Sequence, residues 1–289
     1  MFSKNYRMLM HENYIKRIFK TIEKARLVEN GDKIFVALSG GKDSTVALYA
    51  LKKYIEENSV DCELKGLHIN FGFPSSKKVE NVIKKQTELL DVDLDIVKLK
   101  DIGISFDELS KKTKRPVCSL CGTMKRYLIN KIPLEEGANK VATGHNMDDF
   151  IVSFLKNFLS QNFSWTSKFR PKLESTHPKL LCKIRPLFEV GNKETEIICK
   201  SKKLPFIKED LCPHVELKCK IDFKREKWYE TIYEIERWNK GFRLQFIKAV
   251  EKISRKFEDF TDESKLRMCS VCGQPTNQEI CAFCKLVRL

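Results

Sequence analysis

The sequence predicts an open α/β fold, in which a sheet of parallel strands carries helices on both faces. Short apolar stretches alternate with helical stretches of about 10–15 residues. A glycine-rich turn directly follows the first apolar stretch. Strands separated by helices pair in parallel through right-handed crossovers, and such sheets bind ligands at the carboxyl ends of their strands. We therefore expect the functional site in the loops after Leu38, Ile69 and Thr143.

The individual elements follow from apolar spacing and turn signals. Tyr14, Ile18 and Ile22, among many basic residues, predict an amphipathic helix over residues 5–28 that ends in a turn. Further elements are predicted as strands at residues 33–38, 62–69, 94–99 and 140–143, and as helices at residues 44–55, 79–90 and 125–132. Two later helices are predicted from the packing faces of Trp228, Ile232 and Ile235 and of Phe246, Val250, Ile253 and Phe257.

Composition limits the class of protein. The chain has 54 Lys and Arg against 39 Asp and Glu, a net charge of +15, which predicts a polyanionic partner, nucleic acid before membrane. The sequence has no apolar run of the roughly 18 residues that a spanning helix needs, so we expect a cytoplasmic protein without a membrane partner. In a reducing compartment, closely spaced cysteines among the eleven are metal ligands or catalytic thiols before they are disulfides.

The glycine-rich turn predicts a phosphate-binding loop, and it consists of Ser39, Gly40, Gly41, Lys42, Asp43 and Ser44. It joins a strand to a helix, where backbone N–H groups and the helix dipole stabilise an anion. It is not a Walker A loop, because Val36 and Asp43 stand where that motif needs Gly and Ser or Thr. A carboxylate in an anion-binding loop is reasonable if it holds Mg²⁺ that bridges the phosphates, so Asp43 predicts a magnesium ion.

Polar and cysteine residues follow at the same predicted edge. His145, Asp148 and Asp149 come directly after a short strand, where they face a nucleotide or cap the next helix. Cys118 and Cys121 form a CxxC pair at a helix start, which fits a redox pair, half a zinc site or part of an iron–sulfur site. The candidates for a third thiolate are Cys212, which ends a strand-like stretch at residues 205–208, and, as substitutes, Cys199 and Cys219; Cys62 and Cys182 are assigned to packing.

The last cysteines predict a separate metal site. The ligands are Cys269, Cys272, Cys281 and Cys284, two CxxC pairs that are close enough to fold over one ion. Four thiolates with no open position make a closed structural site, and Zn²⁺ is its usual metal. The predicted division of the chain is a basic helix (residues 1–28), the α/β catalytic domain (29–215), a helical extension that contacts nucleic acid (216–265) and a zinc finger (266–289).

These segments together resemble a known family. Residues 39–44 look like the SGGxDS loop of the N-type ATP pyrophosphatases, the PP-loop superfamily with a Rossmann-like fold, and residues 142–149 are similar to the (A/T)TGHNxDD segment of its tRNA thiolases. The CxxCGxxKR pattern at Cys118, Cys121, Gly122, Lys125 and Arg126, with a distal Cys212, resembles the TtuA/Ncs family of tRNA 2-thiolation enzymes and, more distantly, TtcA. The terminal cysteines resemble the C-terminal zinc finger of the TtuA/Ncs branch.

The resemblance implies an ATP-dependent tRNA 2-thiouridine synthetase. A uridine C2 oxygen is adenylated, and sulfur is then transferred through a [4Fe-4S] cluster on Cys118, Cys121 and Cys212. The residues implied to bind ATP, besides those of the loop, are His68, Gly144, His145 and Asp148, and the implied catalytic side chains are Asp43, Lys125 and Asp149. The implied partners are tRNA and a sulfur donor, either a thiocarboxylated ubiquitin-like protein or sulfide, with a homodimer as the expected assembly.

Three alternatives remain open from the sequence: a tRNA 2-thiocytidine synthetase of the TtcA type, an ATP pyrophosphatase that adenylates a small molecule, and a zinc-containing RNA-binding protein. Members of the TtuA/Ncs branch usually carry an N-terminal zinc finger as well, whereas this chain has no cysteine before Cys62. Wobble uridine, T-loop uridine and anticodon-loop cytidine are all candidate targets. Basic stretches at residues 111–115, 168–172 and 200–203 are candidates for phosphate contacts.

Overall fold

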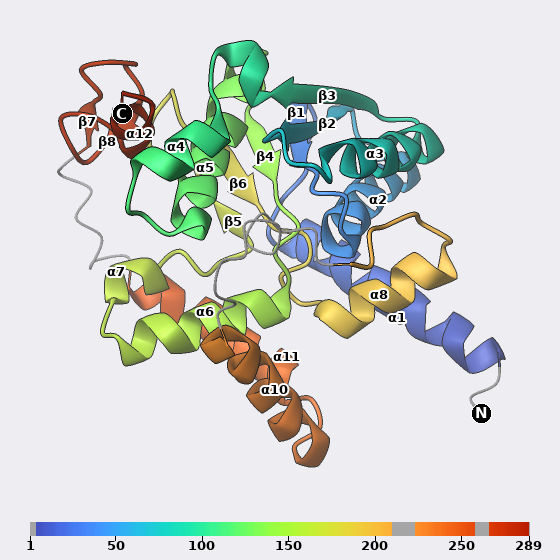
Figure 1. Ribbon diagram of the computed structural model, residues 1–289. Helices are drawn as coiled ribbons and strands as arrows, with labels where there is room; N and C mark the ends of the chain where they lie inside the picture. The colour runs from blue at the N-terminus through green and yellow to red at the C-terminus, as the bar shows by residue number, and fades with distance from the viewer. Residues whose placement is uncertain (1–3, 210–222, 258–265, 289) are drawn as a thin grey trace.

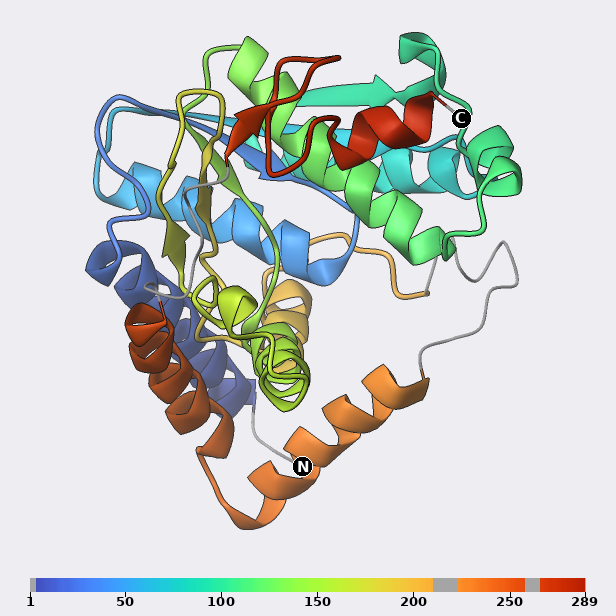
Figure 2. The same cartoon turned by 90° about the vertical axis from the view of Figure 1, so that its left-hand side faces the viewer.

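The computed structural model describes residues 4–209, 223–257 and 266–288, and the side chains from residue 11 onward within them apart from that of Phe223 (Figures 1 and 2). The helices are α1 (Lys4–Lys24), α2 (Lys42–Glu57), α3 (Ser76–Leu90), α4 (Phe106–Lys112), α5 (Val117–Glu135), α6 (Met147–Leu159), α7 (Phe163–Thr166), α8 (Asn192–Ser201), α10 (Phe223–Trp238), α11 (Phe242–Lys256) and α12 (Ala282–Val287). The strands are β1 (Asp32–Ala37), β2 (Cys62–Asn70), β3 (Asp93–Lys98), β4 (Lys140–Ala142), β5 (Lys172–Leu173), β6 (Cys182–Ile184), β7 (Arg267–Met268) and β8 (Pro275–Thr276).

The predicted parallel sheet is confirmed. The strands of the large sheet lie in the order β3-β2-β1-β4-β6-β5, and every pair is parallel except β5 with β6. The antiparallel edge strand β5 corrects the expectation of a purely parallel sheet, because a short loop, rather than a crossover helix, joins it to β6. Leu99, predicted as the end of a strand, instead begins the 3₁₀ helix η1 (Leu99–Ile102).

Each face of the sheet has its own apolar core. Ile34 and Val36 of β1 point to one face, where they pack with α1, α2 and α8, whereas Phe35 points to the other face and packs with α5. This alternation follows from the two-residue period of a strand. Helices therefore cover both faces, as predicted, and Figure 2 shows α2 and α5 on opposite sides of the strands.

The N-terminal helix α1 is part of this packed body. Ile15, Ile18 and Ile22 are fully or almost fully buried against the first face of the sheet. The helix ends at Lys24, four residues before the predicted end, because Arg26 has a left-handed backbone (φ 47°) that breaks the helical turn.

The helices α6, α10 and α11 form a third apolar cluster beside the sheet (Figure 1). The predicted packing faces are confirmed at Ile232 and Val250, which are 0% and 1% exposed. Ile253 is an exception, because 39% of its surface is exposed, while the packed face of α11 continues through Ser254, which is fully buried. In the described part of the chain, every helix is too short or too polar to cross a membrane.

Candidate active site

The phosphate loop has the expected position between β1 and α2. Gly40 has a left-handed backbone (φ 78°), and Gly41 is the N-cap residue of α2. Ser44 turns back on the loop, since its Oγ accepts from the Ser39 N–H at 3.2 Å and donates to the Gly41 carbonyl at 3.0 Å. The loop is thus held in shape with the first N–H groups of α2 directed toward its concave side, which suits a phosphate.

Two neighbouring segments contact this loop through backbone atoms. The Ile207 N–H donates to the Gly40 carbonyl at 3.0 Å, and a Cβ on Gly40 would lie 2.8 Å from the Ile207 side chain. A Cβ on Gly144 would lie 2.6 Å from the Ser44 backbone nitrogen. Residues 205–208 are not a strand, which corrects the prediction, but they do run along the phosphate loop. The loops after β1 and β4 therefore meet at the carboxyl edge of the sheet.

Lys42 and Asp43 have defined partners in the structure. The Lys42 ammonium donates to Asp43 Oδ2 and to Asn192 Oδ1, both at 2.9 Å. Asp43 Oδ1 accepts from the Thr195 hydroxyl at 2.5 Å. Burial raises the pKa of Asp43, and the charge of Lys42 and the Thr195 hydrogen bond offset part of this effect. Both loop side chains thus point toward the N-terminus of α8.

His68 supports the start of the loop from β2. Its Nδ1 lies 2.9 Å from the Leu38 carbonyl oxygen, so Nδ1 carries the proton and donates. Burial lowers the pKa of His68, which keeps the imidazole neutral and leaves Nε2 as an acceptor.

His145 and Asp149 lie in the loop after β4 and in the first turn of α6. His145 is exposed, and its Nδ1 is 3.0 Å from the Thr143 hydroxyl. Asp149 forms a capping box with Asn146: its Oδ2 accepts from the Asn146 N–H at 3.1 Å. Its Oδ1 accepts from the Tyr229 hydroxyl of α10 at 2.5 Å. His145 is therefore open to a ligand, whereas both oxygens of Asp149 have protein partners.

Asp148 is fully buried and belongs to an ionic network between helices. Its Oδ1 accepts from Arg243 Nη1 at 2.8 Å, and its Oδ2 accepts from the Asn192 N–H at 2.8 Å and from the Tyr233 hydroxyl at 2.6 Å. Arg243 Nη2 also donates to Glu194 at 2.6 Å. These partners occupy the carboxylate, so we do not place Asp148 among the nucleotide contacts.

Cys118 and Cys121 lie in the first turn of α5, the helix that begins after the carboxyl edge of β3. Cys118 is exposed and Cys121 is buried. Burial raises the pKa of Cys121, and the ammonium of Lys125 offsets part of that rise. Lys125 also lies 5.5 Å from the ring centre of Phe71, the residue after β2. Cys212 and Cys219 lie outside the described residues.

Cys199 is not a substitute ligand, which corrects that alternative. It is fully buried on α8, in the apolar core of the sheet face opposite to the core that contains Cys121. Its thiol donates to the Lys42 carbonyl at 3.6 Å, and burial raises its pKa to about 12.

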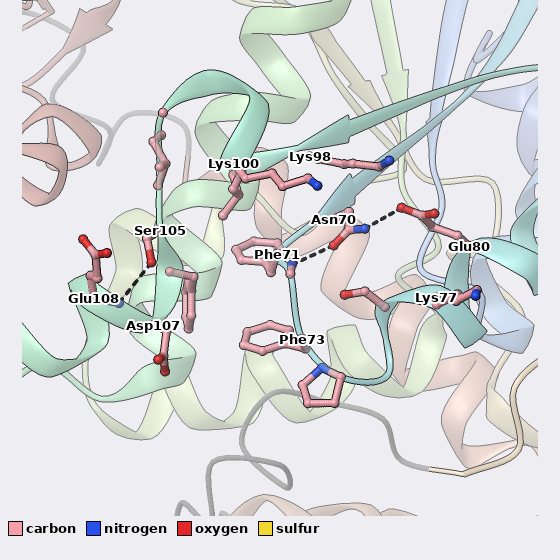
Figure 3. Close-up of a pocket in the computed structure, with 17 residues that line it drawn as sticks. Asn70, Phe71, Phe73, Lys77, Glu80, Lys98, Lys100, Ser105, Asp107 and Glu108 are labelled. Atoms are coloured by element: carbon pink, nitrogen blue, oxygen red, sulfur yellow. Dashed lines mark hydrogen bonds between the residues drawn. The ribbon is translucent and has the colours of Figure 1, made fainter.

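A pocket of about 710 Å³ opens beside Phe71, between the loops after β2 and β3 and the start of α4 (Figure 3). Three aromatic rings form one wall: Phe71 is stacked with Phe73 (ring centres 5.9 Å apart), and both meet Phe106 edge to face at 5.2 Å. The lysines of the pocket are Lys77, Lys98 and Lys100. The carboxylates Glu80, Asp107 and Glu108 line it as well, so its aromatic wall suits a planar ligand.

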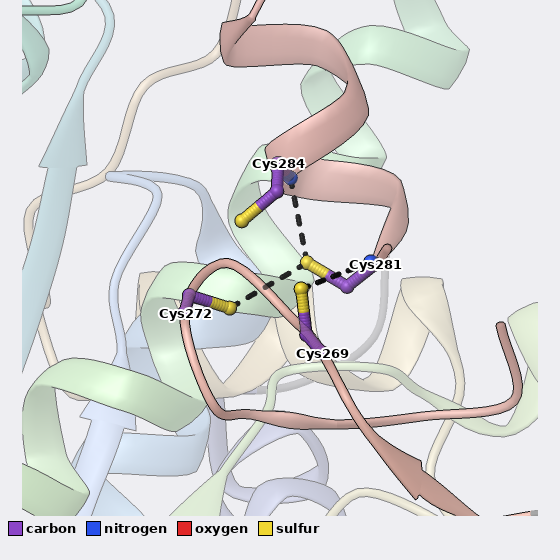
Figure 4. Close-up of side chains that lie close together, drawn as sticks. All are labelled: Cys269, Cys272, Cys281 and Cys284. Carbon is purple, nitrogen blue, oxygen red and sulfur yellow. Dashed lines mark hydrogen bonds between the residues drawn. The ribbon is translucent and has the colours of Figure 1, made fainter. Parts of the chain in front are cut away.

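The terminal cysteines form one cluster. The Sγ atoms of Cys269, Cys272, Cys281 and Cys284 all lie within 4.8 Å of one another (Figure 4). Cys272 Sγ and Cys281 Sγ are 3.8 Å apart, which matches the edge of a tetrahedron with Zn–S bonds of about 2.3 Å. Burial alone would raise the pKa of Cys269, but backbone N–H donors, including that of Cys281, lower it to about 6. The donor set thus fits Zn²⁺.

Sequence reasoning missed three residues of this region, namely Asn192, Thr195 and Arg243. A glycine and an asparagine before a helical run are a helix-start signal, which marks the beginning of α8 but not its contact with the phosphate loop. The predicted basic stretches are partly neutralised: Lys111, Lys172 and Lys202 pair with Asp107, Glu174 and Glu12 at 2.8–3.0 Å.

Comparison with known proteins agrees with this geometry. A family model described as a PP-loop domain matches residues 10–211. The chain is 36% identical over 276 residues to the tRNA-5-methyluridine(54) 2-sulfurtransferase of Pyrococcus horikoshii, covering 95% of this chain and 84% of the relative. It is 34% identical over 276 residues to the enzyme of the same name from Thermotoga maritima, covering 94% and 86%.

A solved structure has the same fold. The U34-tRNA thiolase NcsA from Methanococcus maripaludis, described with its [4Fe-4S] cluster, has a TM-score of 0.80 and 23% identity, over 98% of this chain and 88% of that chain. The phosphate loop, the sheet order and the relatives that cover most of its length agree: the chain belongs to the PP-loop family and, within it, to the tRNA 2-sulfurtransferases.

Proposed function

We propose that this protein is an ATP-dependent tRNA 2-sulfurtransferase that replaces the C2 oxygen of a tRNA uridine by sulfur. One observation carries the proposal: the phosphate loop and the cysteine-bearing end of α5 lie at the same edge of the sheet, with Lys125 over Phe71. The relatives at 36% and 34% identity support position 54 as the target, because both are named for that nucleotide.

The phosphate loop would bind ATP through the backbone N–H groups at the start of α2 and through Lys42. Asp43 would hold Mg²⁺, whose chemistry is to bridge and neutralise the phosphates. His145 is exposed beside the loop, and the Nε2 of His68 remains an acceptor, so both are suited to contact the nucleotide.

Cys118, Cys121 and Cys212 would hold a [4Fe-4S] cluster, as NcsA does according to its description. The first two fit, because they are three residues apart on one helical turn and therefore share a face. The described chain runs past the phosphate loop at Ile207 and reaches Glu209, three residues before Cys212 in the sequence. The chemistry that such a cluster would supply is the binding of the sulfide that the reaction consumes, and these three cysteines would hold it.

The reaction then has two steps. The uridine C2 oxygen attacks the α-phosphate of ATP, and the bond to pyrophosphate breaks. Sulfide forms a bond to C2, and AMP leaves with the former carbonyl oxygen. We assign the charge stabilisation at that oxygen to Lys125 rather than to Asp149, because the Asp149 oxygens already accept bonds from Asn146 and Tyr229.

The uridine must leave its stack to be modified. The pocket of Figure 3 is its proposed entrance, since Phe73 offers a partly exposed ring for stacking and Lys125 lies across the Phe71 ring. The helical extension and the basic stretch before Cys118 would contact tRNA phosphates, within the four-part division predicted from the sequence.

We further propose that the protein is a cytoplasmic homodimer with Zn²⁺ in its terminal cysteine site. Its sulfur donor would be a thiocarboxylated ubiquitin-like protein or sulfide.

The test is a thiolation assay under anaerobic conditions with unmodified tRNA, ATP, Mg²⁺ and sulfide. We expect a 2-thiouridine derivative at position 54 and one AMP for each sulfur transferred, and we expect Lys42→Ala and Asp43→Ala to abolish both. A thiolated nucleoside at position 34, or a thiolated cytidine, would reject the proposed target. The absence of any thiolated product and of AMP would reject the function.

The cluster is tested by absorption near 400 nm of anaerobically reconstituted protein. We expect Cys118→Ala, Cys121→Ala and Cys212→Ala to lose this absorption. Cys62→Ala is the matched control, because Cys62 lies at the start of β2, at the opposite edge of the sheet, and should keep it. Reconstituted protein that binds only zinc would contradict the cluster.

A further inference from the structure

Helix α8 contacts the phosphate loop at three points along its length. Asn192 Oδ1 accepts from Lys42, the Thr195 hydroxyl donates to Asp43, and the Cys199 thiol donates to the Lys42 carbonyl. Thr195 and Cys199 are fully buried. All three contacts go to the two charged residues of the loop, although α8 begins 150 residues after Lys42.

The orientation of the Asn192 amide is determined by its neighbours. Asn146 Oδ1 accepts from the N–H groups of Asp148 and Asp149, so the other side of that amide must be Nδ2. Asn146 Nδ2 lies 3.0 Å from Asn192 Oδ1, and the Lys42 ammonium lies 2.9 Å from the same Oδ1 atom. Both neighbours are donors, so Asn192 presents its oxygen to them. One oxygen therefore joins the loop after β1 to the loop after β4.

The position of α8 is itself rigidly fixed. The Asn192 N–H donates to Asp148, and Arg243 of α11 holds Asp148 and Glu194 together. A Cβ on Gly191 would lie 2.6 Å from Asp148 Oδ2 and 2.5 Å from Arg243 Nη1. Only glycine leaves room for this ion pair, so the first turn of α8 is anchored to α6 and α11.

We propose that Asn192 and Thr195 are positioning residues of the nucleotide site, which hold Lys42 for the phosphates of ATP and Asp43 for its metal ion. This inference rests on the proposed function, because it assumes that the loop binds ATP with Mg²⁺. Asn192 limits the conformations of a lysine side chain with many rotamers. Thr195 occupies Oδ1 of Asp43, so Oδ2, which accepts from the Lys42 ammonium in this structure, is the oxygen that would hold the metal ion once Lys42 turns to the phosphates.

The experiment measures binding of a non-hydrolysable ATP analogue with Mg²⁺ by calorimetry, and the kinetics of thiolation, on full-length protein. We expect Asn192→Ala to weaken analogue binding about tenfold, since a hydrogen bond to a charged group is lost. The KM for ATP should rise by a similar factor, with kcat within about twofold of wild type at saturating ATP. Thr195→Val should raise the half-saturating Mg²⁺ concentration, and Thr195→Ser should restore it.

Matched controls separate positioning from loss of structure. Among the described residues, Asn157→Ala removes an amide whose bond lies within α6, and Thr231→Val removes a hydroxyl whose bond lies within α10. Both should bind the analogue like wild type. If Asn192→Ala fails to fold, the isosteric Thr195→Val and its serine rescue decide the question.

Wild-type affinity and wild-type Mg²⁺ dependence in both Asn192→Ala and Thr195→Val would overturn the inference and leave the proposed function standing. Failure of the wild-type protein itself to bind the analogue would overturn the proposed function and this inference with it.

Discussion

Gly144 has no room for a side chain, because its Cβ would lie 2.6 Å from the backbone nitrogen and 2.8 Å from the Cα of Ser44. Backbone atoms at the start of α2 cannot move without deforming the phosphate loop. We expect Gly144→Ala to destabilise the protein by about 1–3 kcal/mol, the usual cost of overpacking, and to weaken ATP binding. Chemical denaturation and calorimetric titration with an ATP analogue measure the two effects.

The stability control for this substitution is Gly41→Ala. Gly41 has φ −81°, which any residue adopts, and its Cβ would meet only the Ser39 Oγ, at 3.4 Å. The free energy of unfolding of Gly41→Ala should therefore be close to that of wild type. Equal stability of Gly144→Ala and Gly41→Ala would contradict the close approach of the loops after β1 and β4.

His68 predicts a pH dependence of stability. Its pKa in the folded protein is lowered by burial, so it binds a proton less readily there than in the unfolded chain, whose histidine pKa is about 6.5. The contribution of His68 to the stability of the fold is fully present above the unfolded pKa of about 6.5. It is lost as the pH falls toward the pKa of the folded protein. We therefore expect the stability advantage of wild type over His68→Gln to shrink between about pH 7.5 and pH 5.

The measurement is urea denaturation of both proteins over this pH range. All other titrating groups are shared, so they cancel in the difference between wild type and variant. A difference that stays constant with pH would mean that the pKa of His68 is not lowered in the folded protein.

At the residue scale, the sequence predicts some of the site residues but not the partners of their side chains. The SGGKDS and GHN patterns predict a phosphate loop and its neighbour, because glycine and helix starts leave a local signal. The partner of a carboxylate leaves no such signal. Asp148 looks like Asp149 in the sequence, yet Asp148 is buried in an ionic network while Asp149 caps α6 and meets Tyr229.

At the scale of elements, Arg243 of α11 joins α6 and α8. It is 7% exposed and pairs with Asp148 at 2.8 Å and with Glu194 at 2.6 Å. Its removal would leave two buried carboxylates without a counter-charge. We expect Arg243→Met to lower the free energy of unfolding by about 3–5 kcal/mol, measured by chemical denaturation.

Arg237→Ala is the control, because Arg237 pairs with Glu234 on the exposed surface of α10. Surface pairs contribute about 0–1 kcal/mol, so this variant should resemble wild type. Equal and small effects of both substitutions would mean that α11 does not hold α6 and α8 together.

The predicted elements agree best where apolar spacing is regular. The strands β1 and β2 and the helices α2, α10 and α11 lie where the periodicity places them, within a few residues. The short helices α4, α7 and α8 and the strands β5 and β6 were not predicted, because two to ten residues carry too little periodicity. Residues 205–208 have strand-like composition but run along the phosphate loop without a strand partner in the described sheet.

At the scale of the whole molecule, the terminal cysteine site is packed against α5. Phe283 stacks on Tyr127 with ring centres 3.8 Å apart, and Leu286 is 2% exposed in the same core as Cys121. Metal removal should therefore affect the cysteine-bearing helix as well as the terminus. We expect a strong zinc chelator, or Cys284→Ser, to lower Tm by several degrees, at about 2–4 °C for each kcal/mol lost.

Metal analysis should find about one zinc per chain in wild type and much less in Cys284→Ser. Cys182→Ser is a suitable comparison, because this buried cysteine lies in the core of the opposite sheet face and should leave zinc content unchanged. Unchanged Tm after complete removal of the metal would show that the terminus stabilises neither itself nor α5.

The sequence by itself determined the class of fold, the phosphate loop and the terminal cysteine site, because each of these depends on short-range spacing: alternating apolar stretches, a strand–glycine–helix turn, and two CxxC pairs. Only the tertiary structure decided which side chains act together. Asn192 and Thr195 reach Lys42 and Asp43, Arg243 reaches Asp148, and Cys199 lies in the core of the sheet face opposite to that of Cys121, since crossovers place distant segments on particular faces of the sheet.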